Sequence, residues 1–157
     1  MTILEKKVDA IARHLLEGNP LAQRKALAEL RQLMAGNVPL GSLEEEIYTA
    51  LTQLGIPAAN NGFRHLAAAI RLCVEREELS YNITKQLYPE VAKACGTTAK
   101  RAERTMRHAI ELCFERCDPE IIEEYFGNSV SPNKGKLTNS EFIVRLSNVM
   151  RQRMNGR

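Results

Sequence analysis

Basic and acidic side chains lie close together near residue 100 of the 157-residue sequence, and their types suit contacts with base edges. Arg101 and Arg104 carry planar guanidinium groups that match the two acceptors of guanine in a DNA major groove. The carboxylate of Glu103 can accept a hydrogen bond from cytosine N4. We therefore predict that these three residues read bases. Phosphates position a protein without reading sequence, and the side chains better placed for them are Lys85, Lys93, Arg107 and His108.

Two short helices joined by a tight turn must position these side chains. Ala92 on the first helix is small enough to let the second helix pack closely, and Gly96 can take the positive φ that such a turn needs. Thr97 or Thr98 then caps the second helix. The segment is therefore predicted to be a helix-turn-helix.

The second helix has two chemically different faces at 100° per residue. Its apolar face contains Ala99, Ala102, Met106, Ala109, Ile110, Cys113 and Cys117. Its other face contains Lys100, Arg101, Arg104, Arg107, His108 and Glu111, with Glu103 at the border. A basic stripe alone is more often a solvated helix face. Combined with the small packing residue and the turn glycine, it favours DNA binding.

The whole chain is predicted to be an all-α multi-helix bundle, because apolar residues recur at helical spacing and no stretch alternates like a strand. The predicted helices span residues 3–17, 20–35, 43–54, 63–77, 83–94, 98–117, 119–126 and 138–153. The composition, 44% apolar and 26% charged, is that of a globular domain. The four cysteines lie in apolar patterns without paired spacing, so we expect reduced thiols.

Residues 1–41 are predicted to form an N-terminal helical hairpin with a linker, and residues 42–157 a separate domain. The linker is 36–41, where glycine and proline break the helical pattern. The apolar stripes of the hairpin are Leu4, Val8, Ile11 and Leu15, then Leu27, Leu30, Leu33 and Met34. Two helices cannot hide that much apolar surface from water. Either a second copy covers it, which gives a homodimer through residues 1–36, or the hairpin packs on its own chain.

Charge and hydropathy exclude other classes of protein. The net charge is only +3, from 22 basic and 19 acidic residues, so it neither demands nor forbids a nucleic-acid partner. Aromatic residues are 5% with no tryptophan, which argues against stacking of single-stranded bases. No apolar run approaches the roughly 18 residues that a bilayer needs. We therefore expect a cytoplasmic protein without a membrane partner.

No set of residues predicts catalysis. The histidines are scattered, no serine or cysteine lies in a nucleophile motif, and no glycine-rich loop follows a strand. Cys113 and Cys117 could bring two thiolates to one metal, but nothing completes four ligands. We expect no enzyme activity, no cofactor and no metal.

Three segments carry a resemblance to a known family. They are NITKQLYPEVAK at 82–93, TTAKRAERTMRHAIE at 97–111 and TNSEFI at 138–143, and Gly55-Ile-Pro and Phe126-Gly fit as well. Residues 43–153 resemble the C-terminal effector domain of the stage-zero sporulation response regulator of endospore-forming Firmicutes. The resemblance implies an all-helical DNA-binding domain that binds boxes similar to TGTCGAA in tandem and activates or represses transcription.

The same resemblance assigns residues to roles. It implies base reading by Arg101, Glu103 and Arg104, and it gives backbone contacts to Lys100, Arg107, His108, Lys134 and Lys136. The stretch 117–130 corresponds to the surface that contacts the polymerase sigma subunit. Here it carries Glu120, Glu123 and Glu124, which makes it more acidic than the family pattern.

The family protein begins with a phosphoacceptor receiver domain, an α/β fold that residues 1–42 do not resemble. We therefore expect a regulator without a phosphorylation switch. The alternative is a helical adaptor that acts through protein contacts, for example by pairing with a related regulator. The donor and acceptor pattern of Arg101, Glu103 and Arg104 favours DNA, because an adaptor has no need of it.

Overall fold

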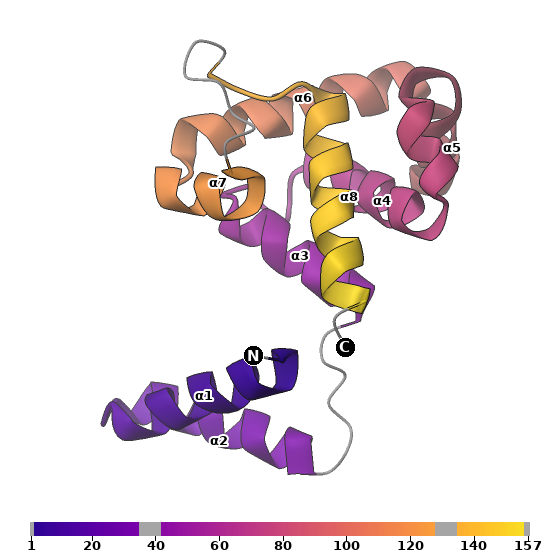
Figure 1. Cartoon of the computed structure of the whole chain (residues 1–157). Helices are drawn as coiled ribbons and strands as arrows, with labels where there is room; N and C mark the ends of the chain where they lie inside the picture. Colours follow the sequence, from indigo (N-terminus) through magenta and orange to yellow (C-terminus); the bar gives the residue numbers. More distant parts are fainter. Residues whose placement is uncertain (1, 35–41, 128–134, 156–157) are drawn as a thin grey trace. The chain divides into compact units, whose positions relative to one another are not determined.

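The computed structural model describes residues 2–34, 42–127 and 135–155, and every regular element in these ranges is helical (Figure 1). The predicted all-α fold class is therefore confirmed. The chain divides into two compact units, Met1–Ser42 with Arg153–Arg157 and Leu43–Gln152. None of the described helices is both long and apolar enough to cross a membrane. The predicted linker at 36–41 lies outside the described residues.

The first unit contains a helical hairpin of α1 (Ile3–Leu16) and α2 (Pro20–Met34), which pack against each other. Thr2 and Glu5 form a reciprocal capping box at the start of α1. Ile11 and Ala26 are buried among the side chains of this pair that the structure describes. The bounds agree with the prediction to within one residue.

Much of the apolar surface of this hairpin is open to water in a single chain. Leu16 is 85% exposed, Leu21 77%, Val8 47% and Leu27 41%. These four are among the six large apolar residues that are exposed in the described parts of the chain. The side chains of Leu4, Leu33 and Met34, which the sequence placed on the same stripes, are outside the described set.

The second unit is built around one hydrophobic core. Its α-helices are α3 (Leu43–Gln53), α4 (Asn61–Glu75), α5 (Tyr88–Cys95), α6 (Ala99–Arg116), α7 (Pro119–Phe126) and α8 (Asn139–Asn155). Helix α4 packs against α3, α5 and α6. Leu66 of α4, Met106 of α6 and Phe142 of α8 are completely buried in the same cluster. The core therefore holds α6 from one side only.

The segment predicted as a helix at 83–94 is helical throughout, but its first five residues form a π-helical turn instead of an α-helical one. A 3-10 turn at Glu77–Tyr81 and a π-helical turn at Ile83–Leu87 precede α5. Pro89 has no N–H, and its ring crowds the carbonyl four residues back. The backbone N–H of Tyr88 accordingly bonds to the Ile83 carbonyl, one residue further back than in an α-helix.

Helix α4 begins two residues before the predicted start. The side chain of Asn60 accepts a hydrogen bond of 2.7 Å from the backbone N–H of Gly62. Asn60 is therefore the N-cap, and Asn61 and Gly62 belong to the first turn of the helix.

Candidate nucleic-acid interface

The backbone between α5 and α6 makes the tight turn that the sequence predicts. Gly96 ends α5 in the left-handed conformation with φ of 67°. The hydroxyl of Thr98 accepts from the backbone N–H of Arg101, so Thr98 rather than Thr97 caps α6. Ala92 is 7% exposed on the inner side of α5, as expected for a close packing position.

Helix α6 has the two faces that its sequence predicts. Its buried residues are Ala102, Met106, Ala109, Ile110 and Cys113. Ala99 and Cys117 are half-buried at the ends of this stripe. The exposed residues include Lys100, Arg101, Arg104, Arg107 and His108. The helix therefore presents a row of cations to solvent while its other side is anchored in the core.

The cations at the start of α6 are available to a ligand. Lys100, Arg101 and Arg104 are exposed, and none makes an ion pair with another described residue. Lys93 on α5 is exposed as well, and within the described ranges it has no acidic partner. Unpaired guanidinium and ammonium groups at the N-terminal end of an exposed helix suit a polyanion.

Glu103 and Arg107, by contrast, bind each other. The Arg107 guanidinium donates to Glu103 Oε1 at 2.6 Å, and the side chains of Arg107 and Glu103 are 53% and 33% exposed respectively. An exposed pair of this kind on one helix is worth only about 0.3–0.5 kcal/mol. A phosphate or a base edge can therefore displace it. Until then, Glu103 orients Arg107 along the side of α6.

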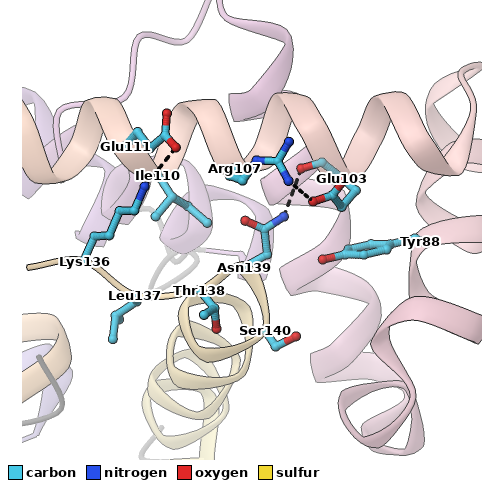
Figure 2. Close-up of a pocket in the computed structure, with 10 residues that line it drawn as sticks. All are labelled: Tyr88, Glu103, Arg107, Ile110, Glu111, Lys136, Leu137, Thr138, Asn139 and Ser140. Atoms are coloured by element: carbon cyan, nitrogen blue, oxygen red, sulfur yellow. Dashed lines mark hydrogen bonds and ion pairs between the residues drawn. The ribbon is translucent and has the colours of Figure 1, made fainter. Parts of the chain in front are cut away.

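A groove of about 340 Å³ lies between α6 and the start of α8 (Figure 2). Lys136 reaches across it to Glu111, with 2.9 Å between Nζ and Oε1. This hydrogen bond and the positive charge of Lys136 lower the pKa of the Glu111 carboxyl. His108 lies 3.9 Å from the other Glu111 oxygen. The structure thus brings Lys136 to the C-terminal half of α6, whereas Lys134 is outside the described residues.

Asn139, which the sequence analysis did not single out, joins α8 to α6. Its side-chain amide donates to the backbone carbonyl of Glu103 at 2.9 Å (Figure 2). Asn139 is only 9% exposed. Thr138 and Glu141 form reciprocal hydrogen bonds that cap α8 beside it. The TNSEFI segment is part of the family resemblance, but nothing in its sequence pattern indicates that Asn139 contacts a residue 36 positions away.

Helix α7 carries the acidic surface noted in the sequence. Glu120, Glu123 and Glu124 are exposed, while Tyr125 and Phe126 are buried. The hydroxyl of Tyr125 donates to the side-chain oxygen of Gln53 and fixes α7 to α3. Residues 128–130 of the predicted sigma-contacting stretch are outside the described part.

The cysteines of α6 are structural. Cys113 is completely buried, and burial raises the pKa of its thiol to about 12. The Cys117 thiol donates to the Gln53 carbonyl at 3.6 Å. Within the described ranges, no three His, Cys, Asp or Glu side chains converge as metal ligands do.

An all-helical domain that anchors one basic helix in its core and exposes the cations after a tight turn has the arrangement expected of a helical DNA-binding domain. The family model for the sporulation initiation factor Spo0A C terminal matches residues 47–150. The chain belongs to this family. Its C-terminal domain is therefore a DNA-binding regulatory domain of the effector type, and the family is not one of enzymes.

Proposed function

We propose that this protein is a transcriptional regulator that binds double-stranded DNA at boxes similar to TGTCGAA through α6. The base-reading residues are Arg101, Glu103 and Arg104. The backbone contacts are Lys93, Lys100, Arg107, His108, Lys134 and Lys136. The observation that carries the proposal is the row of exposed cations at the start of α6, which no described carboxylate pairs, in a chain of this family.

The ion pairs of α6 divide the proposed contact residues into those that a described carboxylate holds and those that none holds. Arg101 and Arg104 can meet guanine at once, because no described acidic residue holds them. Arg107 and Lys136 must first leave Glu103 and Glu111. Base reading is therefore concentrated at the N-terminal end of α6, while the contacts further along it strengthen as a phosphate replaces each carboxylate.

A titration of the full chain with duplexes tests this proposal. We expect tight binding to a TGTCGAA duplex, weaker binding to a scrambled duplex of equal length, and a steep loss of affinity with salt as counterions are released. Equal affinity for both duplexes at moderate salt would count against base reading. No binding to either duplex would favour the helical adaptor. The observation that supports an adaptor is the exposed apolar surface of the hairpin.

We propose further that regulation by this protein needs no phosphorylation. The described residues 2–34 fold as two helices without a strand, whereas a receiver domain is an α/β fold. A protein of this kind would act in the cytoplasm, where a bacterial chromosome lies. The same proposal includes a contact between α7 and the polymerase sigma subunit. Three glutamates of α7 face solvent, so this surface is more acidic than the family pattern.

The hairpin supplies a means of pairing two DNA-binding domains. Leu16 and Leu21 flank the turn between α1 and α2 and are 85% and 77% exposed. A second copy that covers this surface would give a symmetric four-helix dimer through residues 1–36, and tandem boxes could then be bound together.

Sedimentation of two full-length variants tests the dimer. Leu16→Glu and Leu21→Glu should each yield a monomer that binds tandem boxes more weakly but a single box about equally. Both side chains are exposed in one chain, so the fold should survive. Ala58→Glu adds the same charge at an exposed position outside the hairpin and serves as the control. A wild-type chain that sediments as a monomer at every concentration would refute the dimer.

A further inference from the structure

Two separate features of α4 meet the same residue of α6, Thr105. The His65 ring nitrogen Nδ1 lies 2.6 Å from the Thr105 hydroxyl oxygen. A Cβ built on Gly62 would lie 2.4 Å from the Thr105 carbonyl oxygen. The side chain of Thr105 is therefore hydrogen-bonded to α4, and its backbone carbonyl lies close to the start of the same helix. Neither His65 nor Thr105 has a role in the predicted DNA interface.

The direction of the hydrogen bond follows from the Thr105 hydroxyl. This hydroxyl has one proton, and it donates to the Ala102 carbonyl at 3.1 Å. Its oxygen must then accept from His65, so the ring carries its proton on Nδ1. His65 Nε2 is buried and has no hydrogen-bond partner among the described residues. Within the described part of the chain, Thr105 is therefore the single polar anchor of the His65 ring, and His65 is 3% exposed.

Thr105 lies directly after Arg104 in the chain, at the border between the buried and exposed faces of α6. A contact at the border of a helix resists rotation about its axis better than an apolar contact at the centre of the buried face. Binding groups need placement to within about 0.5 Å and 10–20°. The long side chains of Arg101 and Arg104 magnify any rotation of α6.

We propose that His65 is a positioning residue for α6: its hydrogen bond to Thr105 sets the rotation of the helix and so governs discrimination between DNA sequences. This inference rests on the proposed DNA binding. Phosphate contacts carry no sequence information, and the flexible stem of a lysine lets its ammonium group follow a phosphate through a small rotation of α6. His65 therefore affects the ratio of the affinity for a TGTCGAA duplex to the affinity for a scrambled duplex. The affinity for scrambled DNA itself is left unchanged.

Two substitutions at residue 105 separate the hydroxyl from the shape of the side chain. Thr105→Val keeps the branched shape and removes the hydroxyl, while Thr105→Ser keeps the hydroxyl. We expect the affinity ratio of TGTCGAA to scrambled duplex to fall about tenfold in Thr105→Val, with an unchanged salt slope. Thr105→Ser should keep the wild-type ratio. A folded Thr105→Val chain with the wild-type ratio would overturn the proposal.

A double variant distinguishes positioning from loss of stability. Thr105→Val leaves the His65 N–H unsatisfied, whereas replacing both partners with apolar groups relieves that cost. The His65→Leu, Thr105→Val chain should therefore regain thermal stability and still discriminate poorly. Recovery of discrimination together with stability would show a merely structural role. A wild-type chain that does not discriminate would overturn the proposed function itself, and the inference with it.

Discussion

The side-chain amide of Asn139 donates to the backbone carbonyl oxygen of Glu103 at 2.9 Å, across 36 residues of sequence. The Glu103 carboxylate is at the same time bound by Arg107. Glu103 is thus held at its backbone by α8 and at its side chain by α6 itself (Figure 2). A residue proposed to read bases is fixed before DNA arrives.

Removing the Asn139 amide should destabilise the DNA-binding unit. Asn139→Ala leaves the partly buried Glu103 carbonyl without this donor, and a loss of about 1–3 kcal/mol in the free energy of unfolding is expected. Urea denaturation monitored by circular dichroism measures it. Ser140→Ala, at the exposed neighbouring position in the same groove, should change stability by less than about 0.5 kcal/mol. Equal effects of the two changes would contradict the role of the amide.

Gly62→Ala should also destabilise the fold, although alanine is the better helix former by about 1 kcal/mol. The added Cβ would lie 2.4 Å from the Thr105 carbonyl oxygen and 2.6 Å from the Ala109 Cβ. Overpacking of this kind costs about 1–3 kcal/mol. Thermal unfolding of Gly62→Ala and of the exposed neighbour Asn61→Ala provides the comparison. A melting temperature for Gly62→Ala at or above that of the wild type would show that α4 and α6 move apart easily.

Acid should weaken the fold through His65. Burial, and then the charge of Arg64, lower the pKa of this histidine from 6.5. The unfolded chain therefore binds the proton more readily, and stability falls as the pH drops below about 6.5 until the folded-state pKa is passed. Urea unfolding at pH 7.5 and 5.5 should show a larger loss for the wild type than for His65→Leu. Parallel losses in the two proteins would assign the acid sensitivity to other groups.

The two classes of proposed DNA contact should respond differently to substitution. Arg104→Ala should cost about 1–3 kcal/mol on a TGTCGAA duplex and relax discrimination there. Lys93→Ala should weaken binding to all duplexes alike and reduce the salt slope by about one. Fluorescence titrations over a salt series measure both. The opposite ranking would mean that α5, rather than α6, reads the bases.

The sequence predicts the helices and the two faces of α6 well because both depend on local periodicity. Burial of Met106 and exposure of Arg104 follow from 100° steps along one helix. The positive φ of Gly96 follows from the conformational freedom of glycine in a short turn. Local rules fail where a proline acts on residues before it, as Pro89 does on the π-helical turn at Ile83–Leu87.

The partners of the site residues could not be predicted, because they are distant in sequence. Asn139 contacts Glu103 at a separation of 36 residues, and His65 contacts Thr105 at a separation of 40. No spacing rule connects such pairs. By contrast, the Glu103–Arg107 and His108–Glu111 pairs, four and three residues apart on one helix, could have been found by helical geometry.

The close approach of Gly62 to α6 limits how this protein can change during evolution. One of the two near contacts that a Cβ at residue 62 would make with α6 is with a side chain, so Ala109→Gly could relieve it. The other is with the Thr105 backbone carbonyl, which every amino acid possesses. No single exchange on α6 can therefore compensate for a larger residue at 62. A lineage that lost this glycine would have to shift the whole helix, and with it the cations that α6 presents to solvent.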